Sequence, residues 1–219
     1  MNKNIAVIIL AAGKSTRMKS DTPKVLHNIC ARPMLGYVLG LVSSLKINKV
    51  IIVLGHKQEQ VRKLIKPGTK VVIQKRLLGT GDAVKVALSG LRNFKGTLLV
   101  LYADNPLLKP ETIKKVLKHH TENNLDATLL TARLDKPDGY GRILRDKYSS
   151  ICGIVEEKDA DDFQKDIKEI NTGIACFNKE KLSYALKYVR PNNRKKEYYL
   201  TDAIGIIYKG NGLIDSVRL

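Results

Sequence analysis

Short apolar runs alternate with amphipathic helical patterns through the first half of the chain. Apolar runs at Ile5–Leu10, Val50–Leu54, Lys70–Gln74 and Thr97–Tyr102 predict strands. After each run, apolar residues recur at helical spacing, which predicts helices over residues 33–45, 58–66, 83–91 and from 110 onward. Strand and helix alternate four times. This alternation predicts an α/β fold with a mostly parallel sheet and helices on both faces.

The pattern changes after residue 125, where strand-like segments follow one another without helices between them. They lie at Ala127–Ala132, Arg142–Arg145, Ser150–Glu156 and Glu169–Phe177. Helices near residues 179–188 and 201–208 and a strand over residues 213–217 follow. Because no repeat or linker interrupts the chain, we expect a single domain over residues 1–219. Its first half covers about residues 1–125, and a β-rich half covers about residues 126–219.

The composition is that of an ordinary globular protein, with 43% hydrophobic and 27% charged residues. Cys30, Cys152 and Cys176 are widely spaced and are expected to pack as small apolar residues rather than as metal ligands. No apolar run has the length of a membrane span, and residues 1–4 lead directly into the first strand. We therefore expect a cytoplasmic protein with no membrane partner.

The net charge of +18 allows two interpretations. A basic protein can bind nucleic acid, or it can hold anionic small molecules while much of its lysine excess lies on a solvated surface. The sequence has no recognisable nucleic-acid-binding motif, few aromatic residues and no Trp for base stacking. These features favour anionic small molecules as partners.

The end of the first apolar run is the strongest candidate for a phosphate site. Ala11, Ala12 and Gly13 allow a ligand close to the backbone, and Lys14, Arg17, Lys19 and Lys24 follow as a group of cations. Backbone N–H groups and cations are what a polyphosphate requires. The spacing is neither that of a P-loop nor that of a G-x-G-x-x-G fingerprint. A solvated basic loop after an ordinary strand remains the alternative.

Two further loops follow predicted strands. Asp104 comes just after the strand that ends at Tyr102, at the sheet edge where α/β proteins bind ligands, and a carboxylate there suits Mg²⁺. The alternative is an Asp that caps the turn before Pro106. Gln74 stands at the end of another strand, where its amide could recognise a base edge. Gly79 and Gly81 then permit a tight turn, and a plain turn that leads into a helix is the alternative there.

These segments resemble the motifs of sugar-nucleotide pyrophosphorylases, which are nucleotidyltransferases with a Rossmann-like, GT-A-like fold. The matches are Leu10–Met18, Pro23–Lys24 and the motif around Tyr102 and Asp104. The resemblance implies Arg17, Lys24 and Asp104 as catalytic residues, with Asp104 as the ligand of Mg²⁺. It implies a nucleotide site formed by Leu10, Ala11, Ala12, Gly13, Lys24, Gln74, Gly79, Thr80, Tyr102 and Ala103.

Later segments resemble one subfamily, the uridylyltransferase half of bifunctional N-acetylglucosamine-1-phosphate uridylyltransferases. They are Gly139–Arg142, Ile154–Ala160, Glu169–Gly173 and Tyr198–Asp202. The resemblance implies that Gly141, Glu156 and Asn171 hold the sugar. It also implies that UTP and N-acetylglucosamine 1-phosphate react to give UDP-N-acetylglucosamine (UDP-GlcNAc) and pyrophosphate. The alternatives are that Glu156 pairs with Lys158 on a strand surface and that Asn171 is a turn residue.

Several positions depart from the family pattern. Arg76, Leu77 and Asp82 stand where the uridylyltransferases have Glu, Gln and His, and Ala103 replaces a glycine. They leave open a pyrophosphorylase for another nucleotide or sugar 1-phosphate.

The family also has a second metal ligand, an asparagine, and a C-terminal β-helix with the trimer contacts, and both come after the point that corresponds to Leu219. A non-catalytic sugar-nucleotide binding module therefore remains possible. We expect this chain to be a monomer, and a trimer if a β-helix domain follows it.

Overall fold

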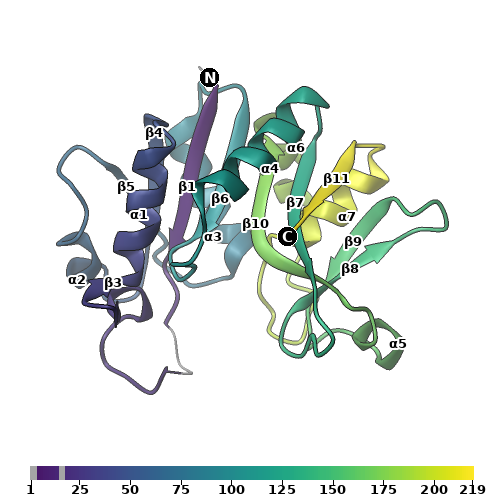
Figure 1. Ribbon diagram of the computed structural model, residues 1–219, viewed down its shortest axis with the longest axis horizontal. Coiled ribbons are helices and arrows are strands. Elements are labelled where there is room, and N and C mark those ends of the chain that lie inside the picture. The colour runs from purple at the N-terminus through teal and green to yellow at the C-terminus, as the bar shows by residue number, and fades with distance from the viewer. Residues whose placement is uncertain (1–3, 15–17) are drawn as a thin grey trace.

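The computed structural model describes residues 4–14 and 18–219, and one mixed sheet runs through this part of the chain (Figure 1). Its main path has the order β11–β7–β10–β6–β1–β4–β5. In chain order the strands are β1 (Ile5–Ala11), β4 (Lys49–Leu54), β5 (Lys70–Ile73), β6 (Thr97–Tyr102), β7 (Ala127–Arg133), β10 (Glu169–Asn178) and β11 (Ile214–Arg218). The strands predicted from apolar runs are therefore confirmed to within one or two residues.

Most of these strands run in the same direction. β1 pairs in parallel with β4 and β6, β4 pairs in parallel with β5, and β7 pairs in parallel with β11. β10 is antiparallel to both of its neighbours on this path, β6 and β7. The predicted mostly parallel α/β fold is confirmed.

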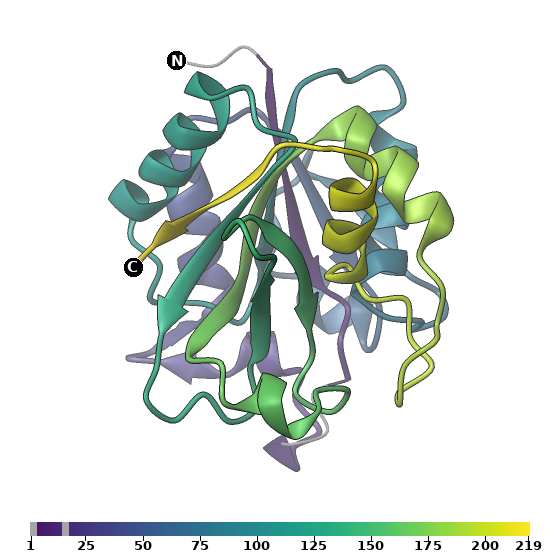
Figure 2. The same ribbon diagram turned by 90° about the vertical axis from the view of Figure 1, so that its right-hand side faces the viewer.

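Helices cover both faces of the sheet because alternate strand residues point to opposite sides. Val7 and Ile9 of β1 share a buried cluster with α1 (Met34–Ser44) and α4 (Pro110–Glu122). Ala6 and Ile8 share the opposite cluster with α3 (Thr80–Leu88), α6 (Lys179–Tyr188) and α7 (Asp202–Lys209). Figure 2 shows the two helical layers on either side of the sheet. Every helix among the described residues is too short or too polar to cross a lipid bilayer.

A hairpin extends the sheet beside the main path. β8 (Gly141–Arg145) pairs with β10 and with β9 (Ile151–Val155), and α5 (Asp162–Lys165) follows (Figure 2). The sequence analysis missed α5. Its start carries a capping box, in which Asp161 Oδ1 accepts from the Gln164 N–H at 2.8 Å and Gln164 Oε1 accepts from the Asp161 N–H at 3.1 Å. That D-x-x-Q pattern is a readable signal for a helix start.

The remaining short elements lie outside the nine-stranded sheet. They are η2 (Lys24–Leu26), β2 (Asn28–Ile29), β3 (Arg32–Pro33), α2 (Gln58–Arg62) and η3 (Ser89–Leu91). The β2–β3 hairpin was not predicted, because two-residue strands leave no periodic pattern. α3 begins at Thr80, three residues before the first apolar position that predicted it. Its first turn rests on the backbone of another segment and needs no apolar side chain for this contact.

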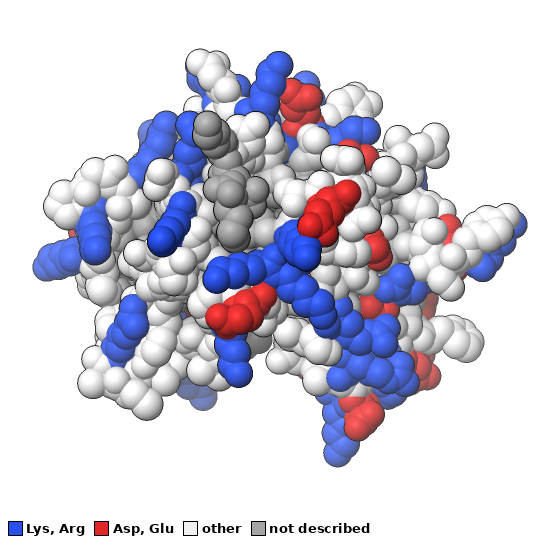
Figure 3. All heavy atoms as spheres, turned by 45° about the horizontal axis from the view of Figure 1, so that its top comes forward, with Lys and Arg blue, Asp and Glu red and all other residues white. Residues whose placement is uncertain are grey.

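Lysine and arginine side chains are spread over much of the molecular surface in Figure 3, with acidic side chains between them. The chain has 39 basic and 21 acidic residues. Part of the excess of lysine and arginine on this face therefore lies on the solvated surface. This agrees with the interpretation that much of the lysine excess only solvates the surface.

Candidate functional site

The carboxyl ends of β1 and β6 place two of the predicted loops side by side. Leu10 lies opposite Tyr102 in the parallel pairing, and the Ala103 N–H donates to the Leu10 carbonyl at 3.0 Å. Ala12 is buried and Gly13 is exposed. Among the described residues, no atom lies within 4 Å of a Cβ built at Gly13, and the φ of Gly13 lies outside the left-handed region. The backbone freedom of a glycine is therefore not used at this position.

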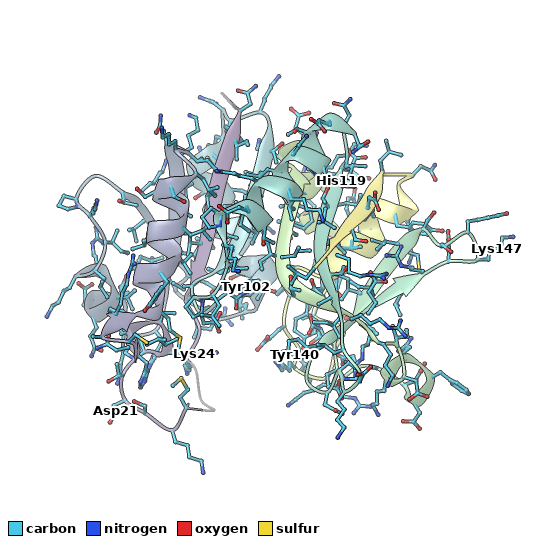
Figure 4. The ribbon with its side chains drawn as sticks, in the orientation of Figure 1. Asp21, Lys24, Tyr102, His119, Tyr140 and Lys147 are labelled. Atoms are coloured by element: carbon cyan, nitrogen blue, oxygen red, sulfur yellow. The ribbon has the colours of Figure 1, made fainter. Side chains whose placement is uncertain are left out.

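Lys24 and Asp104 are the clearest charged pair at this edge. Their side chains are 80 positions apart in the sequence, yet Lys24 Nζ lies 2.7 Å from Asp104 Oδ2. The exposed fractions are 33% for Lys24 and 31% for Asp104, so both remain accessible to a ligand. Figure 4 shows Lys24 and Tyr102 at the same end of the central strands. The structure brings the predicted phosphate cation and the predicted metal ligand together.

Arg17, the other predicted catalytic cation, lies outside the described residues. Its catalytic role, which in the family resemblance is to stabilise the leaving pyrophosphate, stays a prediction from the sequence.

Gln74 lies inside the turn that precedes α3. It is 4% exposed, and its Nε2 donates to the Gly79 carbonyl at 3.0 Å and to Asp82 Oδ2 at 2.7 Å. These contacts orient the side chain from within the turn. Asp82, which replaces a histidine of the family pattern, therefore takes part directly in placing the residue that was predicted to recognise the base.

Gly79 is a position where only glycine fits. Its φ is +111° with ψ 176°, and a Cβ there would lie 2.5 Å from the Tyr198 carbonyl oxygen. The close approach permits two hydrogen bonds. Gly81 N–H donates to the Tyr198 carbonyl at 2.8 Å, and Tyr198 N–H donates to the Leu78 carbonyl at 2.7 Å. The predicted turn is thus closed by the segment Tyr198–Thr201, from the far end of the sequence.

Tyr102 connects the loops that were predicted to hold the nucleotide to the second half of the domain. A Cβ on Gly173, whose φ is +86°, would lie 3.0 Å from the Tyr102 ring. Burial, together with the negative charges of Glu156 and Asp104, raises the pKa of the Tyr102 phenol, and a hydrogen bond with Thr80 offsets part of this. Tyr102 is therefore a neutral phenol at physiological pH, close to groups from both halves.

The three residues predicted for the sugar come together across β8 and β10. Asn171 lies opposite Gly141 in the antiparallel pairing. A Cβ at Gly141 would lie 3.2 Å from Ile154 Cγ2 and 3.6 Å from Glu156 Oε2, so Gly141 packs closely beside this carboxylate. Asn171 Oδ1 accepts from the Gly173 N–H at 3.0 Å, a local contact of the kind that the turn-residue alternative expected. This contact leaves the Asn171 side-chain NH₂ to donate elsewhere.

Glu156 is oriented by a residue that the sequence analysis did not single out. Its Oε1 accepts from Thr201 Oγ1 at 3.0 Å, so its described partner is Thr201 rather than the Lys158 of the alternative interpretation. Burial raises the pKa of the Glu156 carboxyl, while the Thr201 hydrogen bond and the charge of Lys195 lower it. The Tyr198–Asp202 motif contained the signal, but only the folded chain shows which atom Thr201 contacts.

Arg142 is a second residue whose contacts the sequence could not give. Its side chain is 1% exposed, and Nη1 lies 2.7 Å from Glu157 Oε2. It also donates to the backbone carbonyls of Tyr140 and Lys165. These bonds fix the loop before β8 next to Gly141, and Figure 4 shows Tyr140 on the opposite half from Lys24.

The donor set for a metal is small. Among the described residues, no group of three or more His, Cys, Asp or Glu side chains could hold a metal ion. Magnesium is commonly bound through one or two carboxylates plus substrate phosphates, and it keeps several waters. Asp104 beside the predicted phosphate loop fits that mode of binding.

A family model described as the MobA-like NTP transferase domain matches residues 7–156. Among curated proteins, the bifunctional protein GlmU of Alkaliphilus metalliredigens is 47% identical over 209 residues, which cover 95% of this chain and 45% of that protein. The GlmU protein of Streptococcus mutans is 44% identical over 212 residues, which cover 97% of this chain and 46% of that protein. The chain therefore spans about half the length of the curated relatives that it matches.

Solved structures of two nucleotidyltransferases share the fold. One is described as a glucose-1-phosphate thymidylyltransferase from Bacillus anthracis in complex with sucrose, with a TM-score of 0.80 and 21% identity over 98% of this chain and 87% of that one. The other is a UDP-glucose pyrophosphorylase complexed with UDP-glucose, with a TM-score of 0.80 and 18% identity over 97% of this chain and 89% of that one. These likenesses confirm the expected GT-A-like architecture.

Proposed function

Since the chain belongs to the MobA-like NTP transferase domain family, we propose that it joins N-acetylglucosamine 1-phosphate to UTP. The products are UDP-GlcNAc and pyrophosphate. The observation that carries this proposal is the arrangement around Tyr102. Lys24 and Asp104, which are suited to binding phosphates and a metal ion, lie on one side of Tyr102. The residues proposed to bind the sugar, Gly141, Glu156 and Asn171, lie on the other side. The similarity to proteins named GlmU supports the choice of nucleotide and sugar.

The reaction needs no protein nucleophile. An oxygen of the sugar 1-phosphate attacks the α-phosphorus of UTP, a new P–O bond forms, and the bond from the α-phosphorus to the bridging oxygen of pyrophosphate breaks. The nucleophile is already ionised, so the protein contributes alignment and charge stabilisation. The loop from Ala11 to Gly13 offers backbone N–H groups to the phosphates, and Lys24 offers a cation.

Asp104 would hold Mg²⁺, which when bound neutralises phosphate charge. In the present structure Lys24 neutralises Asp104 at 2.7 Å. The flexible ammonium of Lys24 can exchange this partner for a phosphate oxygen. On the sugar side, Glu156 accepts from sugar hydroxyls, and Asn171 donates its NH₂ to a hydroxyl or an N-acetyl carbonyl.

We propose that the two halves of the domain bind different parts of the substrates. Residues up to about 125 serve the nucleotide, and residues 126–219 serve the sugar. We also expect a cytoplasmic location and, for this chain alone, a monomer. Light scattering tests the oligomeric state, and a stable trimer of this chain would contradict that expectation.

A second candidate is a pyrophosphorylase for another nucleotide or sugar 1-phosphate. It is motivated by Asp82, which bonds Gln74 at the place where the family has a histidine. Release of pyrophosphate, measured with several nucleotides against several sugar 1-phosphates, separates the two. Highest kcat/KM with UTP and N-acetylglucosamine 1-phosphate supports the proposal. A clear preference for another pair would replace it, and binding without turnover for any pair would indicate a non-catalytic module.

A further inference from the structure

The segment Tyr198–Thr201, which lies between α6 and α7, contacts both sides of the proposed site. Its first part lies on the nucleotide-side turn, where Tyr198 makes the two backbone hydrogen bonds described above. Leu200 N–H then donates to Thr80 Oγ1 at 3.0 Å. Thr201, the next residue, donates to Glu156 on the sugar side. Three hydrogen bonds, two from Tyr198 and one from Leu200, therefore fix the backbone immediately before Thr201.

The hydrogen bond between Thr201 and Glu156 has a defined direction. An ionised carboxylate only accepts hydrogen bonds, so the single hydroxyl proton of Thr201 points to Glu156 Oε1. Thr201 is 8% exposed, which restricts the alternatives open to its hydroxyl. Oε2 lies on the side of Gly141, 3.6 Å from where a Cβ of that residue would be. With Oε1 occupied, Oε2 is the oxygen left to accept from a sugar.

The surroundings explain why Glu156 needs this donor. Burial raises the pKa of the Glu156 carboxyl most, the charges of Asp159 and Glu197 raise it further, and the Thr201 hydrogen bond and the charge of Lys195 lower it. Asp202, directly after Thr201, is also affected, since burial and then the charges of Glu156 and Asp159 raise its pKa to about 6. A buried carboxylate in such a group is held ionised and in one orientation only if it accepts good hydrogen bonds.

We propose that Thr201 is a positioning residue for sugar recognition. It holds Glu156 in the orientation in which Oε2 accepts from the sugar, and residues 198–200 place it from the backbone that closes the nucleotide-side turn. The proposal rests on the proposed function, because it assumes that Glu156 binds the sugar part of UDP-GlcNAc.

The test compares UDP and UDP-GlcNAc binding by calorimetry in the wild type, Thr201→Val and Thr201→Ser. Valine keeps the shape of threonine but has no hydroxyl, whereas serine retains it. Thr121→Val is the matched control, because Thr121 also donates a hydroxyl hydrogen bond, to the Leu117 carbonyl, but on the surface of α4. We expect Thr201→Val to weaken UDP-GlcNAc binding about tenfold, the usual effect of one hydrogen bond to a charged group, and to change UDP binding less than about twofold. Thr201→Ser and Thr121→Val should bind both ligands like the wild type.

Steady-state kinetics supply a second readout. Thr201→Val should raise the KM for the sugar phosphate and leave the KM for UTP unchanged, and Thr201→Ser should restore the former. If Thr201→Val retains the wild-type preference for UDP-GlcNAc over UDP, or if it weakens both ligands equally, the inference is wrong while the proposed function stands. If the wild type itself shows no preference for UDP-GlcNAc over UDP, the premise that Glu156 binds the sugar is wrong and the inference is overturned, whereas pyrophosphate release tests the proposed function separately.

Discussion

Replacing Gly79 by alanine tests whether the turn before α3 depends on close contact with residues 198–200. At φ +111° and ψ 176° the backbone lies in a region that is nearly reserved for glycine, and occupying it with alanine costs about 1–3 kcal/mol. The added Cβ would also lie 2.5 Å from the Tyr198 carbonyl oxygen and 2.9 Å from the Tyr198 nitrogen. Since both are backbone atoms, the backbone around Tyr198 must shift to accommodate the added Cβ.

This shift would weaken or break the two backbone hydrogen bonds of Tyr198, to Gly81 at 2.8 Å and to Leu78 at 2.7 Å. Each contributes about 0.5–1.5 kcal/mol, so Gly79→Ala should lower the free energy of unfolding by about 2–6 kcal/mol in total. Gly68→Ala is the matched control. Gly68 also has a positive φ, of +84°, but a Cβ there meets nothing within 4 Å. It should lose only the conformational term, about 1–2 kcal/mol.

The assay is urea unfolding followed by far-ultraviolet circular dichroism on the wild type and both variants. The expected order of stability is wild type, then Gly68→Ala, then Gly79→Ala. Equal losses in the two variants would refute the claim that contact with Tyr198, rather than backbone conformation alone, makes Gly79 necessary.

Three further predictions follow from individual groups. Asp104→Asn should abolish most Mg²⁺-dependent turnover, since it removes the charge of the proposed metal ligand, and should keep the wild-type circular dichroism spectrum; turnover like the wild type would exclude Asp104 as a ligand. Arg17→Ala, a prediction from the sequence, should lower kcat more than it raises the KM for the sugar phosphate if Arg17 stabilises the leaving pyrophosphate; an effect on KM alone would make Arg17 a ground-state binder. Burial lowers the pKa of His120 from its ordinary 6.5 to about 4. As the pH falls, this histidine is therefore protonated in the unfolded chain before it is protonated in the folded protein. Stability should be complete above pH 6.5 and fall by roughly 3 kcal/mol as the pH drops towards 4, and urea titrations should show a flatter pH dependence in His120→Gln.

The fold could be predicted from the sequence largely because its main strands are continuous apolar runs. Runs such as Ile5–Leu10 are continuous signals of buried strands, and the structure bears them out at β1. The β2–β3 hairpin and α5 were not predicted, because each is too short to show a periodic pattern of hydrophobic residues. α5 could still have been found from its capping residues.

The site could be predicted only in part, because its residues meet through tertiary structure. The sequence indicates a cation at Lys24 and a carboxylate at Asp104, but their contact depends on the parallel pairing of β1 with β6. The link from Thr201 to Glu156 spans 45 positions and depends on how the segment after α6 returns to β9. Contacts of this kind leave no local spacing in the sequence.

The proposed activity is tested most directly by identifying the product formed from UTP and isotopically labelled N-acetylglucosamine 1-phosphate in the presence of Mg²⁺. Mass spectrometry should show labelled UDP-GlcNAc, formed in equal amount to the released pyrophosphate. Its rate of formation should fall sharply in Asp104→Asn. Absence of the labelled product with the wild-type chain, or its formation at an unchanged rate in Asp104→Asn, would contradict the account of how this site transfers a uridylyl group.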